Sequence, residues 1–291
     1  MRPGPVIGLT VGDPAGIGPE LVKRVASKLG RTIRLRVIGS TQGVQPGKPT
    51  LAGAHQARQS LEESVRLLQR GEIHAVVNGP VSKEWLAKAG FRFPGQTEFY
   101  ARRFGQTDDS VTMCMVGPRL RVALAGTHLS LRRAVSGLKP AGIVRAGQHL
   151  AELLRRIGIQ RPRIAICGLN PHAGEQGLFG KEDARVVAPA VRQLLRKTRL
   201  SVAGPEPADT VFRRAVQGEF DGVVALYHDQ GLIPAKLLDF DRTVNVTMGL
   251  PVIRCSPDHG TAFGLAGKGK AKPDSMIEAV KMAFRLAKGK R

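Results

Sequence analysis

The chain is poor in cysteine, in aromatic residues and in acidic residues, and each shortage excludes a class of protein. Its 291 residues include three cysteines, all in apolar segments. Three cysteines are too few for a disulfide framework. We therefore expect each of them to be a core residue, and the protein to reside in the reducing cytoplasm. Aromatic residues make up 4%, with one Trp and two Tyr, which leaves little material for stacking nucleic-acid bases.

Long hydrophobic runs are also missing. No apolar segment approaches the roughly 18 residues that a membrane-spanning helix needs, and the first residues lack the long apolar segment of a signal peptide. We therefore expect no membrane partner and a cytoplasmic location.

The charge of the chain is strongly positive. Lys and Arg number 45 against 23 Asp and Glu, a formal net charge of +22. Such a charge is typical of nucleic-acid binders, but these basic residues are spread along the chain and are locally dense only over 268–291. We favour a basic surface that attracts anionic, phosphorylated small molecules, and consider a nucleic-acid partner the weaker alternative.

Short apolar runs alternate with helical periodicity along the whole chain. This alternation predicts an α/β fold with a largely parallel sheet. The final helix is predicted over 276–287, and strands are predicted over 6–11, 35–38, 73–77, 111–116, 120–125, 163–167, 222–226, 243–248 and 251–255.

Three histidines lie where predicted strands end. His128 follows the strand over 120–125, His172 lies in an irregular polar loop after 163–167, and His228 follows 222–226, where Gly231 is expected to end the strand. Open α/β sheets bind ligands at the carboxyl ends of their strands. The three imidazoles therefore predict a tertiary metal site with coordination positions open to substrate.

Several polar residues suggest an anion site near these histidines. Lys236, Asn245 and Arg254 supply donors on successive segments, and the last two interrupt apolar strands and so need partners. Helix capping explains Thr97 and Asp209 as well as a functional role does. The glycine-rich turn over 12–20 is compatible with a tight turn or with ligand contact, since it matches neither GxGxxG nor a Walker loop.

Four motifs together resemble one known family. GDPAGIGPE at 12–20, NPHAGE at 170–175, YHDQG at 227–231 and DHGTA at 258–262 occur in the order found in the 4-hydroxythreonine-4-phosphate dehydrogenases of vitamin B6 biosynthesis. The resemblance implies an isocitrate/isopropylmalate dehydrogenase-like fold of two α/β domains with a cleft between them, and a homodimer with shared active sites. We expect a cofactor-side domain over 1–105 and 255–291 and a metal- and substrate-binding domain over 106–254.

The resemblance also implies roles for individual residues. The implied cofactors are NAD or NADP and a divalent metal (Zn, Mg, Mn or Co). Our own candidate for proton transfer is Lys236, or a water held by Asp229 or Asp209. The implied metal ligands are His128, His172 and His228; the implied substrate-binding residues are Gln96, Thr97, Lys236, Asn245 and Arg254; and the implied cofactor-binding residues are His259, Gly260, Thr261, Ala262 and Gly267.

One position departs from the family pattern. Gln96 stands where the family usually has His, and a glutamine cannot carry a proton or a positive charge at neutral pH. The expected activity is oxidation of 4-phosphooxy-L-threonine to a 3-keto acid that decarboxylates to 3-amino-2-oxopropyl phosphate. The alternatives are a dehydrogenase of a related phosphorylated hydroxy acid, such as 4-phosphothreonate, and a phosphate acyltransferase-like enzyme.

Overall fold

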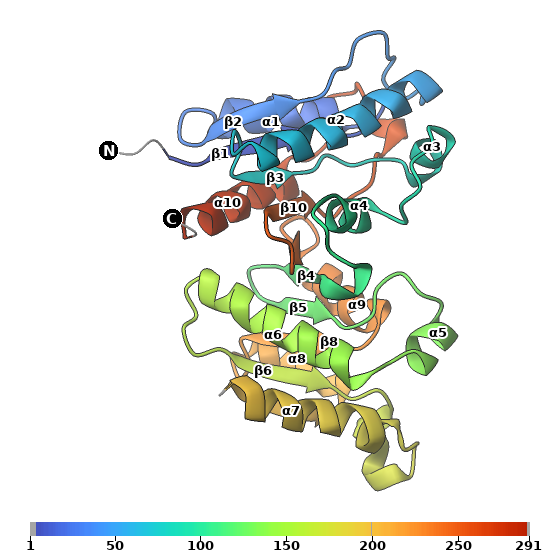
Figure 1. The fold of residues 1–291 in the computed structure, drawn as a ribbon, viewed down its shortest axis with the longest axis vertical. Helices are drawn as coiled ribbons and strands as arrows, with labels where there is room; N and C mark the ends of the chain where they lie inside the picture. Colours follow the sequence, from blue (N-terminus) through green and yellow to red (C-terminus); the bar gives the residue numbers. More distant parts are fainter. Residues whose placement is uncertain (1–3, 199, 290–291) are drawn as a thin grey trace. The chain divides into compact units, whose positions relative to one another are not determined.

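The computed structural model describes residues 4–198 and 200–289, and the chain forms two compact units (Figure 1). Unit 1 comprises Met1–Asp108 and Asp241–Arg291, and unit 2 comprises Asp109–Phe240. The second boundary differs from the predicted one, because residues 241–254 belong to unit 1. This segment contains the strand Val244–Met248, which pairs with the strand Ile253–Pro257. That strand pairs in turn with Ala75–Val77, a strand from the first part of unit 1.

Unit 1 is built on a mostly parallel sheet. Its strands lie in the order β2-β1-β3-β10-β9, and all neighbours are parallel except β10 and β9, which are antiparallel. Four of the five residues of β1 and all of β3 are buried, which explains why these two strands read as apolar runs. The strands are β1 (Val6–Thr10), β2 (Arg34–Ile38), β3 (Ala75–Val77), β9 (Val244–Met248) and β10 (Ile253–Pro257).

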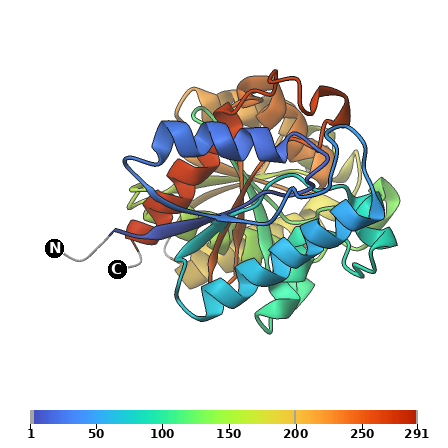
Figure 2. The same ribbon diagram turned by 90° about the horizontal axis from the view of Figure 1, so that it is seen from above.

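Helices cover both faces of this sheet. Helices α1 and α10 pack on one face and α2 on the other (Figure 2). Thr50 accepts a hydrogen bond from the Gly53 amide at the start of α2, and Ser82 accepts one from the Trp85 amide at the start of α3. The helices are α1 (Gly18–Leu29), α2 (Leu51–Gln69), α3 (Lys83–Lys88), α4 (Gln96–Arg103) and α10 (Asp274–Lys288).

The strands of unit 2 lie in the order β4-β5-β8-β6-β7. Strands β4 and β5 are antiparallel, and β5, β8, β6 and β7 are parallel, so their carboxyl ends share one edge. The elements are β4 (Thr112–Val116), β5 (Arg121–Leu124), β6 (Arg163–Cys167), β7 (Ser201–Glu206), β8 (Gly222–Ala225), α5 (Leu131–Ser136), α6 (Pro140–Arg156), α7 (Ala188–Thr198), α8 (Ala208–Val216) and α9 (His228–Asp239).

Two segments of unit 2 differ from the sequence prediction. Helix α9 begins at His228 and continues past Gly231, which the sequence marked as a break. Glycine is needed there for packing, because a Cβ at Gly231 would lie 2.7 Å from Leu124 Cδ2 and 2.8 Å from Val122 Cγ1. Strand β7, which includes Gly204 and Pro205 joined by a cis peptide bond, is not among the predicted strands.

All three cysteines are buried and unbonded, as expected of core residues. Burial raises the pKa of the Cys114 and Cys167 thiols far above the ordinary value. Among the residues that the structure describes, no helix combines the length and the apolar composition that crossing a membrane requires.

Candidate active site

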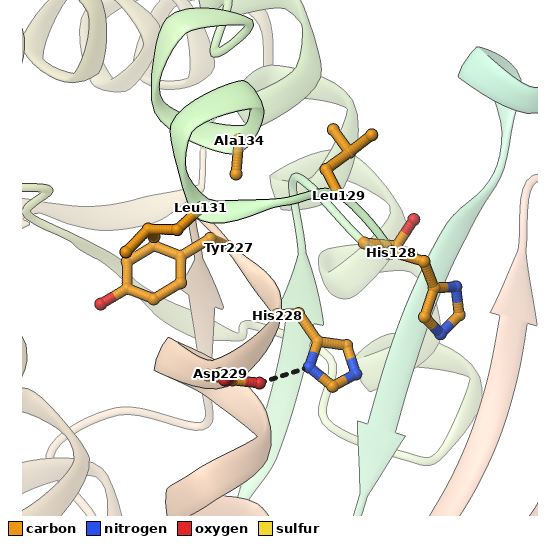
Figure 3. Close-up of a pocket in the computed structure, with 8 residues that line it drawn as sticks. His128, Leu129, Leu131, Ala134, Tyr227, His228 and Asp229 are labelled. Atoms are coloured by element: carbon orange, nitrogen blue, oxygen red, sulfur yellow. Dashed lines mark hydrogen bonds and ion pairs between the residues drawn. The ribbon is translucent and has the colours of Figure 1, made fainter.

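Two of the three predicted metal ligands lie side by side in unit 2 (Figure 3). His128 follows β5 and His228 begins α9, and their ring centres are 5.5 Å apart with the planes tilted by 41°. Imidazoles bound to one tetrahedral zinc through nitrogens ~2.1 Å from the ion have ring centres roughly 5 Å apart. The spacing of the pair therefore fits two ligands of one metal.

Asp229 fixes the orientation of the His228 ring. The Nδ1 atom of His228 lies 2.6 Å from Oδ1 of Asp229, a distance at which Nδ1–H donates to the carboxylate. That tautomer leaves the lone pair of Nε2 for a metal.

A pocket of about 230 Å³ opens beside the two histidines. Its wall is formed by residues of the β5–α5 connection and of α5, with Tyr227 and Asp229 on the other side (Figure 3). Leu129 and Leu131 make part of this wall apolar, although their side chains are 54% and 62% exposed. The pocket combines an apolar surface with imidazole and carboxylate groups, the combination that small-molecule sites use.

His172 lies in an irregular loop after β6. The loop over Pro171–Gly177 has left-handed backbone at several residues that are not glycine, with φ of 50° at His172 and 53° at Ala173. This agrees with the prediction that no regular element forms there. Across residues 4–198 and 200–289, no three His, Cys, Asp or Glu side chains lie close enough to hold one metal, so His172 does not join the pair within this chain.

A buried carboxylate holds the base of the His172 loop. Asp183 is 3% exposed, and its oxygens accept hydrogen bonds from the amide of Leu169 at 2.6 Å, the amide of Asn170 at 3.0 Å and the Asn170 side chain at 3.1 Å. These bonds pair donors that would otherwise be buried at the end of β6. The loop is therefore anchored at the residues that precede His172.

The proton-transfer candidates lie on two helices of unit 2. Lys236 is half-buried on α9, with Nζ 6.0 Å from the centre of the Phe240 ring. Asp209 is exposed in the first turn of α8, whose N-cap residue is Pro207, so the alternative that Asp209 caps this helix is wrong.

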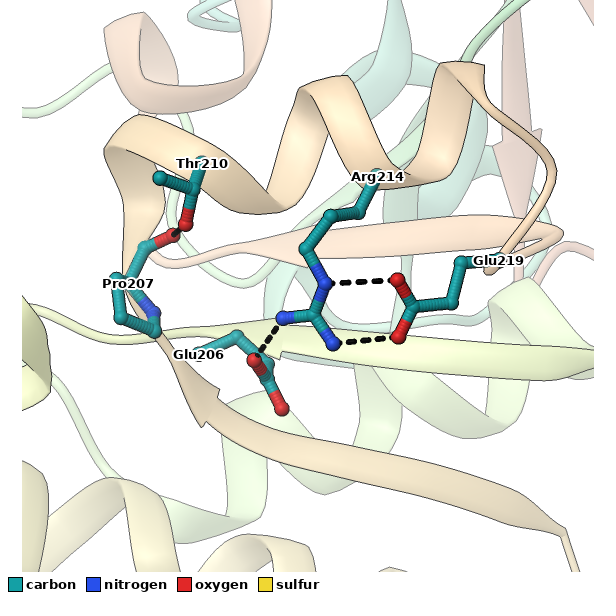
Figure 4. Close-up of polar contacts among 5 residues, drawn as sticks. All are labelled: Glu206, Pro207, Thr210, Arg214 and Glu219. Atoms are coloured by element: carbon teal, nitrogen blue, oxygen red, sulfur yellow. Dashed lines mark hydrogen bonds and ion pairs between the residues drawn. The ribbon is translucent and has the colours of Figure 1, made fainter.

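Arg214, in the last turn of α8, ties this helix by charge to the residues on either side of it (Figure 4). Arg214 donates from Nε to Glu219 at 2.8 Å and also bonds to Glu206 at the end of β7. Hydrogen bonds to the two carboxylates raise the pKa of the Arg214 guanidinium further above its usual range. The interaction links the end of β7 to the helix that carries Asp209.

In unit 1, Arg254 is a buried cation with neutral hydrogen-bond partners. Its side chain on β10 is 3% exposed; Nε donates to Asn78 Oδ1 at 2.8 Å and Nη1 donates to Thr247 Oγ1 at 3.2 Å. Burial lowers the pKa of Arg254, but a guanidinium stays protonated at any physiological pH. A buried positive charge held by neutral groups is the chemistry of an anion site.

The other predicted substrate residues of unit 1 lie on α4 and β9. Gln96 and Thr97 occupy the first turn of α4, which begins at Gln96 after Gly95, so Thr97 is not the cap. Gln96 donates weakly to the Gly79 carbonyl at 3.4 Å, and its buried Oε1 has no partner among the described residues.

Asn245 is half-buried on β9, opposite Ser256 of β10. We had expected Asn245 and Arg254 in the metal- and substrate-binding domain over 106–254, but the structure places both in unit 1.

The predicted cofactor loop packs on the glycine-rich turn over 12–20. Ile17 donates its amide to the carbonyl of Thr261 at 2.9 Å, and a Cβ at Gly16 would lie 2.8 Å from that oxygen. Gly12 has a φ of 76° and touches the backbone at Pro80. Close packing of the backbone therefore explains why Gly12 and Gly16 are glycines. Of the two alternatives for the turn over 12–20, this favours a tight turn over ligand contact.

His259 is the polar group of the cofactor loop. Burial lowers the pKa of its imidazole, so the ring is neutral at pH 7. Nδ1 lies 3.4 Å from the Gly260 carbonyl, and the buried Nε2 has no hydrogen-bond partner in the described part of the chain. Gly260, Ala262 and Gly267 are exposed, and Ala262 is left-handed with a φ of 43°.

Sequence reasoning missed the residues that support the site. Asn78 binds Arg254 and also donates to the hydroxyl of the fully buried Tyr100 at 2.8 Å. Asp183 and Gln230 support the histidine-bearing segments of unit 2 by bonds to the backbone. A polar residue directly after a buried strand is the signal that points to Asn78, but nothing local in the sequence distinguishes Asp183 from a surface carboxylate.

Comparison with known proteins gives a consistent family. The family model of the pyridoxal phosphate biosynthetic protein PdxA matches residues 19–283. The chain is 39% identical to a 4-hydroxythreonine-4-phosphate dehydrogenase of Zymomonas mobilis over 99% of this chain and 96% of the relative. It is also 39% identical to a D-threonate 4-phosphate dehydrogenase of Cupriavidus necator, with 97% of both chains covered.

Solved structures agree with this relationship. The crystal structure of a 4-hydroxythreonine-4-phosphate dehydrogenase from Klebsiella pneumoniae is similar with a TM-score of 0.82 and 37% identity, covering 98% of this chain and 100% of that chain. An isocitrate dehydrogenase from Methylococcus capsulatus is similar in fold, with a TM-score of 0.58 and 16% identity over 97% and 87% of the two chains. The predicted fold class is confirmed, and the chain belongs to the PdxA family of pyridoxal phosphate biosynthetic proteins.

Proposed function

We propose that the protein is an NAD(P)-dependent and divalent-metal-dependent dehydrogenase of 4-phosphooxy-L-threonine. The product is a 3-keto acid that loses carbon dioxide to give 3-amino-2-oxopropyl phosphate. The observation that carries the proposal is the His128–His228 pair, spaced as two ligands of one ion and oriented by Asp229, in a chain of this family.

His128 and His228 would hold the metal, with His172 as the third ligand. When bound, the metal would supply Lewis acidity toward the substrate hydroxyl, and the nicotinamide would supply the hydride acceptor. Asp229 keeps the His228 ring in the ligand tautomer through its bond to Nδ1. Lys236, or a water held by Asp229 or Asp209, accepts the hydroxyl proton.

Unit 1 would bind the phosphate and the cofactor. Arg254 supplies a fixed, permanently charged guanidinium for the phosphate, assisted by Asn245 and Thr97. The unpartnered Oε1 of Gln96 would accept a hydrogen bond from the hydroxyl or ammonium group of the substrate. His259 and the loop around it would hold the adenosine end of the dinucleotide through the neutral imidazole.

We further propose a homodimer in which His172 of one copy completes the metal site of the other. Support comes from unit 2, where Ile233 and Leu237 of α9 are 64% and 84% exposed, and Phe240, directly after α9, is 58% exposed. Large apolar side chains gathered on one helix are typical of a surface that a second protein covers. Light scattering on the purified protein would give twice the chain mass; a monomeric mass under assay conditions would contradict this part of the proposal.

The test is nicotinamide reduction with 4-phosphooxy-L-threonine, followed by absorbance, with and without a chelator. We expect turnover that the chelator abolishes and that added metal restores, and no turnover in the His228→Ala variant. Turnover that survives both the chelator and His228→Ala would refute the metal assignment. Absence of nicotinamide reduction with any phosphorylated hydroxy acid would favour the acyltransferase-like alternative.

A second candidate substrate is 4-phospho-D-threonate. It is supported by Gln96, which replaces the usual family histidine, and by the similarity to relatives named for D-threonate 4-phosphate. Measuring kcat/KM for both substrates on the same preparation decides between them, because the physiological substrate is the one with the larger value.

A further inference from the structure

We propose that Gln230 is a positioning residue that ties together the three segments bearing the predicted metal ligands. The inference rests on the proposed function, because it concerns the placement of those ligands. Gln230 lies in the first turn of α9, two residues after His228, and is 8% exposed.

The amide of Gln230 bridges the ends of two strands. Its Oε1 accepts a hydrogen bond from the amide of Leu226 at 2.7 Å, directly after β8. Its Nε2 donates to the carbonyl of Gly168 at 2.8 Å, directly after β6. Both bonds are buried, so losing either one would leave a backbone group without a partner.

Each bridged segment leads into a histidine. Gly168 lies against Ala173, since a Cβ on Gly168 would be 2.8 Å from Ala173 Cα, and Ala173 is the neighbour of His172. Leu226 precedes His228 by two residues. A shift at either end of the bridge would therefore move one of these imidazoles.

The third histidine segment is attached to the same point. Ala125 donates its amide to the carbonyl of Ala225 at 2.9 Å, next to Leu226. A Cβ on Gly126 would lie 3.1 Å from the Leu226 carbonyl, so these backbones approach closely. Gly126 precedes His128 by two residues, which places the approach to His128 against the bridged end of β8.

Only a side chain with both a donor and an acceptor can make this bridge. A deprotonated glutamate accepts from Leu226 but cannot donate to Gly168, and a methionine of similar length does neither. A purely structural role for Gln230 predicts lower stability with unchanged histidine environments. A positioning role predicts a change at the histidines themselves.

The experiment compares Gln230→Met and Gln230→Glu with the wild type and with Gln217→Met, a control on an exposed glutamine of unit 2. Histidine ring resonances are recorded by NMR on the metal-free protein, and Co²⁺ affinity is measured by titration. In Gln230→Met we expect the His172 and His228 resonances to shift, those of His55 to stay, and the Co²⁺ Kd to rise about 10- to 100-fold. In Gln230→Glu we expect a larger shift at His172 than at His228.

Unchanged ring resonances together with a Co²⁺ Kd within about twofold of the wild type would overturn the proposal. If Gln230→Met does not fold, the isosteric Gln230→Glu variant replaces it. Unchanged His172 ring resonances and an unchanged Co²⁺ Kd in that variant would then overturn the proposal. If the wild type binds no Co²⁺ while the resonances of His172 and His228 respond to the substitutions, the proposed metal site fails and the positioning role stands.

Discussion

The Nε atom of Arg254 donates a hydrogen bond to Oδ1 of Asn78 across 2.8 Å in the interior of unit 1. Asn78 is itself held by the hydroxyl of Tyr100, and that hydroxyl also bonds to Ser64. The guanidinium is thus oriented by a chain of neutral groups, and its charge stays available for an anion.

Arg254→Lys should weaken binding of the phosphorylated substrate. Lysine keeps the charge but loses the planar fork, and a hydrogen bond to a charged group contributes about 1.5–3 kcal/mol, or roughly 10- to 100-fold in affinity. The measurement is KM for 4-phosphooxy-L-threonine. Arg242→Lys, on an exposed arginine of the same unit, should leave KM unchanged; equal KM values for the two variants would argue against Arg254 as the phosphate ligand.

Asp229→Asn should reduce metal affinity. The carboxylate accepts from His228 Nδ1 at 2.6 Å, and replacing such a partner of a metal-binding histidine typically costs about 10- to 100-fold in affinity. Titration with Co²⁺ measures the effect directly. Asp241→Asn, on an exposed carboxylate of unit 1, is the control. A Kd for Asp229→Asn equal to that of the control would contradict the orienting role.

Stability should fall on mild acidification because of His149. Burial lowers the pKa of this imidazole below 6.5, and Nδ1 lies 2.8 Å from the Thr112 hydroxyl. Below pH 6.5 the unfolded chain takes up the proton more readily than the folded chain, so the stability gained from a neutral His149 is present above 6.5 and declines as the pH falls toward the folded-state pKa.

The check is the thermal midpoint of the wild type and of His149→Asn across this pH range. Asparagine keeps an acceptor near the position of Nδ1 but does not titrate. We expect the thermal midpoint of the variant to fall less on acidification than that of the wild type. The fall that remains would come from His259, because burial lowers the pKa of that imidazole too. Identical pH profiles would show that His149 does not contribute.

Gly231→Ala should destabilise the protein despite the higher helix propensity of alanine. A Cβ at this position would lie 2.7–2.9 Å from Leu124, Val122 and Ala225, and overpacking of this kind costs about 1–3 kcal/mol. The expected gain of roughly 0.5–1 kcal/mol from replacing a helical glycine offsets part of it. Urea unfolding measures the difference, with Gly264→Ala as the control because its Cβ would meet open space. Equal free energies of unfolding for the two variants would contradict the prediction, because they would show that α9 moves to accommodate the added methyl group without loss of stability.

The alternation of strands and helices, with the exception of β7, could be predicted from sequence because short apolar runs and period-3.6 apolar patterns are local. The end of β8 shows the limit of such reasoning. Gly231 is a helix breaker by propensity, yet it lies inside α9 because packing against Leu124 excludes any side chain there. Tertiary packing overrides propensity at this point, and no local pattern records it.

The candidate site was predictable where its residues follow strands. His128 and His228 meet because β5 and β8 are parallel neighbours, so their carboxyl ends coincide. The placement of Asn245 and Arg254 in unit 1 was not predictable, since it depends on the pairing of β10 with β3, whose residues are distant in sequence. The roles of Asp183 and Gln230 depend on backbone groups that only the folded chain brings within reach.

The burial of all three thiols makes this chain a convenient background for site-specific chemistry. Because the thiolate is the reactive form and the pKa of the Cys114 and Cys167 thiols is raised, maleimide reagents should leave the native cysteines untouched near neutral pH. A single cysteine placed on an exposed helix could then be labelled with a fluorophore or spin label without first removing the natural ones.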